Sequence, residues 1–134
     1  MHSTLSMPLF ADPSSPAIAR SRATALVESW ASERLQSALS LLVSEVVTNA
    51  VLHGGADICL ELSVLRSHAV RVEVFDSSPE LPELQTTTPL ERESGRGLQL
   101  VDALANTWGA RPRGDGKIVW FELSDADGNP PRTW

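Results

Sequence analysis

The sequence is short of several residue types, and each shortage excludes a class of protein. Among 134 residues there is one cysteine, Cys59, so no disulfide can form within the chain, and a reducing compartment suits it. Positive charge is also scarce: the net charge is −6 and the arginines are scattered along the chain. This balance argues against direct contact with nucleic acid.

Segments of the kind that enter a membrane are missing too. Residues 1–11 lack the basic start and apolar centre of a signal peptide, and we find no apolar run long enough to cross a bilayer. We therefore expect a cytoplasmic protein without membrane contact. With 42% hydrophobic and 21% charged residues, the chain should form one domain around a single core.

The spacing of apolar residues predicts both helices and strands along the chain. Residues 1–15, rich in Ser and Pro, predict a flexible tail with room for a short edge strand near residues 5–10. A hydroxyl cap followed by proline starts a predicted helix over 16–30, and two glycines close a second over 33–53. A third helix is predicted over 98–106.

Alternating apolar and polar residues predict an antiparallel hairpin, with strands over 56–65 and 70–76. Two closing strands are predicted over 107–111 and 117–123, joined by a turn at Asp115-Gly116. Lys117 is interpreted as a solvated turn residue. The domain should span residues 16–123, followed by a flexible tail over 124–134. The predicted fold class is α+β, a two-layer sandwich of a largely antiparallel mixed sheet with about three helices on one face.

The segment 41–53 is apolar on almost every side but carries Glu45, Asn49 and His53 at spacings of i, i+4 and i+8. This spacing places the three side chains on one narrow stripe of the helix. A carboxylate and an amide on an apolar helix are costly unless the stripe faces a wet cleft or a polar ligand. The alternative is that the stripe is the solvated face of an ordinary amphipathic helix.

Side chains alternate between the two faces of a strand, and Asp76 falls on the face that is buried. Its carboxylate should therefore point under the sheet. It either contacts a ligand there or caps the turn that follows it. Residues 79–94 contain three prolines and three consecutive threonines, and so long a connection is typical of a lid or binding loop.

Gly95 and Gly97 follow this loop and open the third predicted helix at Leu98, which favours an anion at the helix start. Two other phosphate motifs are excluded. A P-loop would need Ser or Thr after Lys117 and a glycine at Arg111, and the dinucleotide fingerprint would need glycine at Leu100. We also find no His/Cys cluster suited to zinc.

The order of these features resembles the GHKL superfamily of ATP-binding domains. More closely, the chain resembles the anti-sigma-factor serine/threonine protein kinases from about residue 16 to 123. The segment 45–53 is the specific part of the resemblance, and the segment 95–98 agrees in position. The resemblance implies a Bergerat-type ATP-binding fold.

The resemblance also implies roles for individual residues. Asn49 would hold Mg²⁺, Glu45 would act as the catalytic base, and Asp76 would accept the adenine amino group. The implied nucleotide contacts come from several segments: Asn49, Asp76, Ser78, Gly95, Arg96, Gly97 and Leu98. These roles agree with the chemistry of the side chains, since an amide oxygen suits a hard cation and a carboxylate accepts from an amine.

One segment departs from the family pattern. The family usually has Asp-x-Gly-x-Gly where residues 76–80 read Asp-Ser-Ser-Pro-Glu. Without the two glycines the backbone approaches the nucleotide less closely. We therefore expect weak ATP binding, or binding that needs a partner.

As function, the resemblance implies an ATP- and Mg²⁺-dependent kinase that sequesters a sigma factor, phosphorylates an anti-anti-sigma protein and forms a homodimer. The alternative is a binding module in which the nucleotide is structural or regulatory and no phosphate is transferred. An unrelated α+β interaction domain would require the order of Glu45, Asn49, Asp76 and Gly95 to be coincidental.

Overall fold

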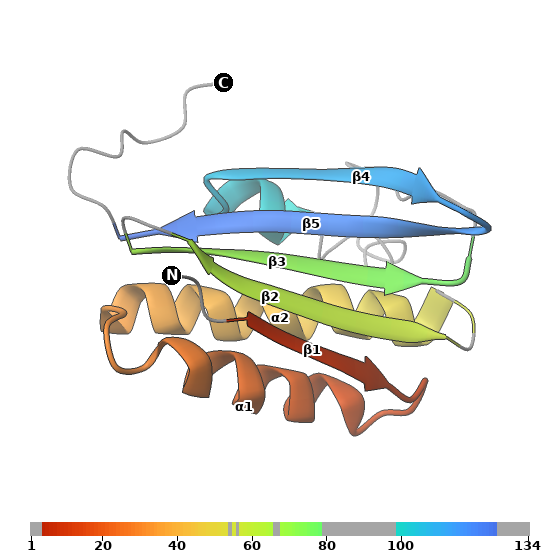
Figure 1. Ribbon diagram of the computed structural model, residues 1–134, viewed down its shortest axis with the longest axis horizontal. Coiled ribbons are helices and arrows are strands. Elements are labelled where there is room, and N and C mark those ends of the chain that lie inside the picture. Colours follow the sequence, from red (N-terminus) through yellow and green to blue (C-terminus); the bar gives the residue numbers. More distant parts are fainter. Residues whose placement is uncertain (1–3, 54, 56, 66–67, 79–98, 126–134) are drawn as a thin grey trace.

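The computed structural model describes residues 4–53, 55, 57–65, 68–78 and 99–125. In these residues five strands form one sheet in the order β1-β2-β3-β5-β4, with helices packed on one face (Figure 1). The elements are β1 (Thr4–Leu9), α1 (Ser15–Val27), α2 (Glu33–His53), β2 (Ile58–Leu65), β3 (Ala69–Asp76), β4 (Thr107–Arg113) and β5 (Gly116–Ser124). Residues 99–104 are also helical. The α+β prediction is confirmed, although all the described strand pairs are antiparallel rather than mixed.

The first strand lies inside the predicted N-terminal tail. β1 pairs with β2 along its whole length, because Leu5, Met7 and Leu9 alternate with polar residues and pack toward the core. The Ser15 hydroxyl then donates to the Phe10 carbonyl oxygen and fixes the turn into α1. The predicted start of the domain at residue 16 is therefore too late.

The two long helices pack against each other and against the sheet. α1 ends at Val27, earlier than the predicted residue 30, and its Ala19, Ala23 and Val27 are fully buried. Small side chains at this spacing let a helix approach its neighbours closely. α2 has the predicted bounds, and α1 covers β1 and β2 while α2 covers β3 and β5.

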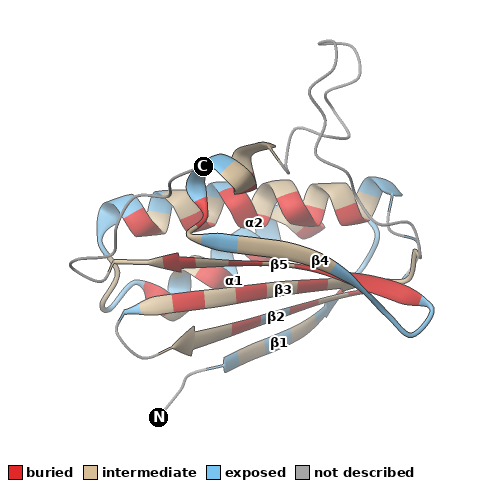
Figure 2. Ribbon diagram, turned by 90° about the horizontal axis from the view of Figure 1, so that it is seen from above, coloured by how far each residue is buried: buried red, intermediate tan, exposed pale blue. Residues whose placement is uncertain are grey.

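From the sequence we expect no apolar run long enough to cross a bilayer, but α2 is one by length and composition. An 18-residue window of this 21-residue helix has a mean hydropathy of 1.4, so by length and composition it could cross a membrane. However, buried residues recur along α2 (Figure 2), which packs against α1, β3 and β5. Seven of its residues are buried: Leu35, Leu39, Leu42, Val43, Val46, Val47 and Ala50. The packing of a core helix accounts for its composition.

The core lies between the sheet and the helices. Along β3, buried and half-buried residues alternate (Figure 2), and Val70, Val72 and Val74 are buried in the core. Phe121 of β5 is the largest fully buried side chain. A strand with one face on the core has this period of two.

The β4–β5 hairpin turns one residue earlier than predicted. Arg113 pairs with Gly116, so Gly114 and Asp115 form the turn, and Gly114 has a φ of 58° that favours glycine. Gly116 instead begins β5, where an added Cβ would collide with the carbonyl oxygen of Asp76 on β3. The glycine thus allows the two strands to approach each other.

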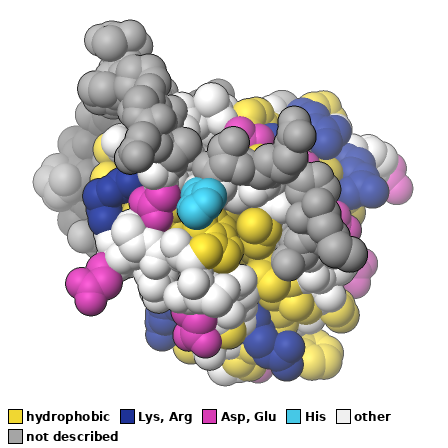
Figure 3. Space-filling view, turned by 60° about the vertical axis from the view of Figure 1, so that its left-hand side comes forward, with side chains coloured by type: hydrophobic (Ala, Val, Ile, Leu, Met, Phe, Trp, Pro, Cys, Tyr) yellow, Lys and Arg dark blue, Asp and Glu magenta, His cyan; other side chains and the backbone are white. Residues whose placement is uncertain are grey.

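The end of β5 is joined to the start of α2. The Asp125 carboxylate accepts hydrogen bonds from the backbone N–H and the hydroxyl of Ser32, at 2.6 and 2.7 Å. It also forms an ion pair with Arg34 at 3.0 Å. Ser32 in turn caps α2 by accepting from the Leu35 N–H. Figure 3 shows this end of the molecule, where acidic and basic side chains surround a small hydrophobic area. Ser124 and Asp125 therefore belong to the domain and not to the predicted tail.

Candidate functional site

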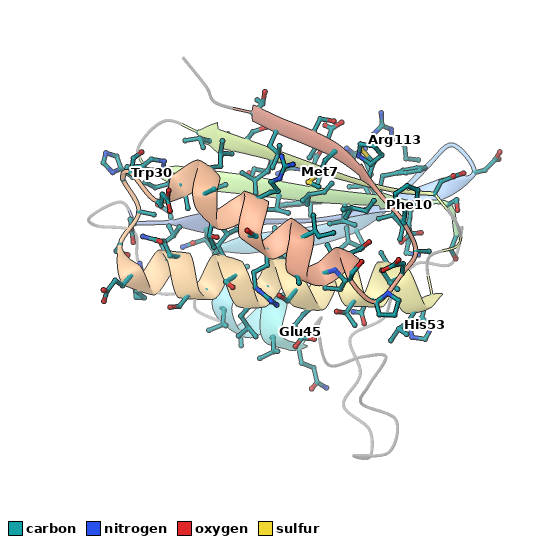
Figure 4. All side chains as sticks on the ribbon, turned by 90° about the horizontal axis from the view of Figure 1, so that it is seen from below. Met7, Phe10, Trp30, Glu45, His53 and Arg113 are labelled. Atoms are coloured by element: carbon teal, nitrogen blue, oxygen red, sulfur yellow. The ribbon has the colours of Figure 1, made fainter. Side chains whose placement is uncertain are left out.

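The polar stripe of α2 lies away from the core. Glu45 and Asn49 are half-buried and His53 is exposed, and Glu45 projects from α2 on the side away from α1 (Figure 4). Leu41 and Leu52 fall on the same side and are 39% and 59% exposed. Within the described part of the chain, the side chains of Glu45 and Asn49 make no hydrogen bond or ion pair. Both side chains therefore retain their hydrogen-bonding capacity for a ligand.

Asp76 closes β3 on the helix-facing side of the sheet, as its parity predicts. Only 2% of the residue is exposed, and α2 packs across β3 and β5. The segments that follow α2 and β3 also meet: Gly55 lies against the side chain of Ser77, whose hydroxyl accepts from the Asp57 N–H. Both α2 and β3 run toward this end of the molecule (Figure 1). The fold thus places the end of the polar stripe and the Asp76 carboxylate at one end of the molecule.

The Asp76 carboxylate has two partners on one oxygen. Lys117 Nζ donates to Oδ1 at 2.9 Å, and the backbone N–H of Ser78 donates to the same atom at 3.0 Å. The turn-cap alternative is therefore seen in the structure, because the Ser78 contact closes the turn after β3. A cap on Oδ1 leaves Oδ2 without a partner among the described residues, so it does not exclude a ligand contact.

The interpretation of Lys117 as a solvated turn residue is wrong. Only 6% of the residue is exposed, and it stands directly opposite Asp76 in the β3–β5 pairing. Strand parity carried the signal: Lys117 is two residues before Val119 and four before Phe121, both of which point inward. Its position beside the hairpin turn made solvent contact look more natural than burial.

Burial makes this pair sensitive to the loss of either charge. The side chains of Lys117 and Asp76 are 8% and 3% exposed. Taking two charges out of water is costly, and the pair is tolerated because the two side chains satisfy each other at hydrogen-bond distance. Removing one partner would leave the other charge buried and unpaired.

Of the other predicted nucleotide contacts, one lies within the described residues and four lie outside them. Ser78 is described and half-buried. Gly95, Arg96, Gly97 and Leu98 lie outside the described residues. The third helix is described from residue 99, and it is held to β4 because Trp108 Nε1 donates to Asp102 Oδ1 at 2.9 Å.

The described side chains of the candidate site suit a cation that a nucleotide also binds. The described residues contain no group of three or more His, Cys, Asp or Glu side chains that could hold a metal alone. Mg²⁺ is commonly bound by one or two protein oxygens together with phosphates and water. The Asn49 amide could supply such an oxygen to a Mg²⁺–nucleotide complex.

A depression lies on the face of the sheet opposite to the helices. It has a volume of about 660 Å³, and Cys59, Phe75, Ile118 and Arg113 are among its lining residues. Phe75 and Ile118 are the sequence neighbours of Asp76 and Lys117, so they point to the other side of the sheet. This depression is therefore distinct from the candidate site.

Comparison with known proteins identifies the family of the chain. The family model for the histidine kinase-like ATPase domain matches residues 9–123. An uncharacterized protein of Streptomyces coelicolor is 38% identical over 92 residues, which cover 66% of this chain and 85% of the relative.

Among solved structures, the RsbU and RsbW domains of a Mycobacterium tuberculosis protein superpose with a TM-score of 0.71 at 19% identity. The match covers 91% of this chain but only 32% of that structure, and at this identity it supports the fold alone. Together with the family match over most of the chain, the fold shows that this chain belongs to the histidine kinase-like ATPase domains, the GHKL type of ATP-binding domain.

Proposed function

We propose that this protein is an ATP-dependent serine/threonine protein kinase that regulates a sigma factor. The observation that carries the proposal is the polar stripe of α2, with half-buried Glu45 and Asn49, at the end of the molecule where Asp76 closes β3. In a GHKL domain this arrangement suits a nucleotide whose base meets Asp76 and whose phosphates extend along α2.

Each side chain would make a separate contribution. Asn49 would place its amide oxygen on a phosphate-bound Mg²⁺, which supplies charge neutralisation when present. Asp76 would accept a hydrogen bond from the adenine amino group on Oδ2, because Oδ1 is held by Lys117 and Ser78. Glu45 lies one helical turn before Asn49, so it could orient a substrate hydroxyl beside the terminal phosphate and accept its proton.

The proposed partners are a sigma factor, which the domain would sequester, and an anti-anti-sigma protein, which would receive the phosphate. The resemblance to anti-sigma-factor kinases supports these partners. The exposed Leu41 and Leu52 flank the polar stripe and give the same side of α2 an apolar component suited to a protein ligand.

Nucleotide binding is tested by calorimetry. Wild type should bind ATP in the presence of Mg²⁺, and both Asn49→Ala and a chelator should weaken binding. Thr48→Ala changes a neighbouring half-buried polar residue of the same helix and serves as the matched control. No binding of millimolar ATP, with and without candidate partners, would reject the nucleotide site.

Phosphoryl transfer is tested separately with labelled ATP and an anti-anti-sigma protein. Glu45→Gln keeps the shape of the side chain but removes the base, so it should retain ATP binding and abolish labelling of the acceptor. If wild type binds both ATP and the acceptor yet transfers nothing, the domain is a binding module.

The binding module is the second candidate, and a specific observation favours it. Ser78 and Glu80 stand where the family segment has its two glycines, and the Ser78 N–H is already bonded to Asp76. A backbone amide used in this way is not free to contact the nucleotide. ATP would then stabilise the domain without being positioned for transfer.

A further inference from the structure

The buried ion pair at the end of β3 places a hydrogen-bond donor beside the carboxylate that is proposed to read the base. Lys117 Nζ lies 2.9 Å from Asp76 Oδ1, and the two residues face each other across neighbouring strands. A group that hydrogen-bonds to Oδ2 on the side facing Oδ1 would therefore lie close to the ammonium. Lys117 is in a position to contact the ligand that Asp76 contacts.

Lys117 also has unused capacity for such a contact. An ammonium group has three N–H donors, and within the described part of the chain its one hydrogen bond goes to Asp76. Only 6% of the residue is exposed. In so dry a position further acceptors are valuable, because an unfilled donor of a buried charge costs free energy.

The pair presents an acceptor and a donor side by side. We infer that Lys117 is a base-reading residue, which donates to the purine edge while Asp76 accepts from it. This inference rests on the proposed nucleotide site. On adenine, Asp76 would accept from the amino group and Lys117 would donate to the ring nitrogen N1.

The same pair does not fit a purine that carries a carbonyl. On hypoxanthine or guanine bound in the same orientation, the carbonyl oxygen O6 would face the Asp76 carboxylate, acceptor against acceptor. The ring N1 of these bases carries a hydrogen, which would face the Lys117 ammonium, donor against donor. The site should therefore bind ATP more tightly than ITP or GTP.

The test uses the wild-type protein and base analogues in calorimetry with Mg²⁺. The 1-deaza analogue of ATP lacks the N1 acceptor and should bind about tenfold more weakly or worse than ATP. The 7-deaza analogue lacks a nitrogen on the other ring and should bind as ATP does. ITP and GTP should bind at least about tenfold more weakly than ATP, because both contacts are lost.

Two variants show whether Lys117 causes the effect. Lys117→Arg keeps a charged donor and should keep the preference for ATP over its 1-deaza analogue. Lys117→Met removes the donor and should bind the two equally, and it should also narrow the difference in affinity between ATP and GTP, because no ammonium then faces the N1 hydrogen of guanine. If Lys117→Met does not fold, the analogue series on wild type still decides the matter.

The outcomes separate this inference from the proposed function. If no nucleotide of the series binds, the nucleotide site itself is wrong. If ATP binds but its 1-deaza analogue binds equally well, or if GTP binds as tightly as ATP, the site stands and the role of Lys117 is overturned.

Discussion

Gly116 and Asp76 are packed so closely that a Cβ at Gly116 would collide with the carbonyl oxygen of Asp76. The contact joins the first residue of β5 to the last residue of β3, and the next residue of β5 is Lys117. The glycine therefore sets the distance at which the ion pair forms.

Gly116→Ala should destabilise the protein by about 2 kcal/mol or more, because the backbone oxygen cannot move out of the way as a flexible side chain can. Equilibrium unfolding in urea measures this loss. Gly114→Asn is the matched control: its surroundings are open, and asparagine tolerates the φ of 58° at that turn. Equal losses in the two variants would contradict the packing argument.

Asp76 and Lys117 should be energetically coupled. Asp76→Asn and Lys117→Met each leave one buried group without its charge partner and should each cost about 3 kcal/mol of unfolding free energy. The double variant removes both charges, so it should lose much less than the sum of the two. Urea unfolding of the three variants completes the cycle, and strictly additive losses would show that the contact contributes nothing.

Asp125 should make the stability of the domain depend on pH in acid. Burial raises the pKa of this carboxyl, but the hydrogen bonds from the Ser32 backbone and side chain and the nearby Arg34 and His68 outweigh it, and the pKa is lowered. A lowered folded pKa means that the stabilisation is fully present above the unfolded value of about 4. It is lost as the pH falls through the folded pKa.

Thermal melting of wild type and Asp125→Asn between pH 7 and pH 2.5 tests this. The wild type should melt at a higher temperature at pH 6, and the difference should narrow below about pH 4. Asp115→Asn removes a charge from the exposed hairpin turn, at the opposite end of β5 from Asp125, and should leave the melting temperature nearly unchanged. A constant gap between wild type and Asp125→Asn at all pH values would contradict the assignment.

Trp108 should hold the third helix to β4. Trp108→Phe keeps an aromatic ring but removes the donor to Asp102, so it should cost about 1 kcal/mol. Amide hydrogen exchange at Ala105, whose N–H bonds to the Val101 carbonyl, should become faster. Trp120→Phe makes the same change on the opposite face of the sheet, where the ring stacks on Arg71, and should leave Ala105 protected.

Local periodicity predicted most of the fold. The bounds of α2 and the inward parity of Asp76 both follow from short-range patterns that the packing preserves. The sequence pattern also allowed β1 but assigned it to a tail, because six residues of alternating polarity beside prolines do not reveal that they have a partner strand. Only the pairing with β2 shows that they belong to the sheet.

The candidate site was predicted less completely, for a related reason. Asp76 and Lys117 are 41 positions apart, and they meet because β5 lies between β3 and β4 in the sheet. No local pattern encodes that strand order or its register. The sequence indicated that Asp76 needs a partner, but the partner could be found only once the two strands were paired.

The cap of α2 affects the order in which parts of the protein reach their final structure during synthesis. Ser32 receives its carboxylate partner from Asp125, 93 positions later, after the final strand. A nascent chain still on the ribosome therefore makes the helix that carries Glu45 and Asn49 long before it makes the residue that secures the start of that helix. The helix cannot reach its final anchored state until almost the whole domain has been synthesised.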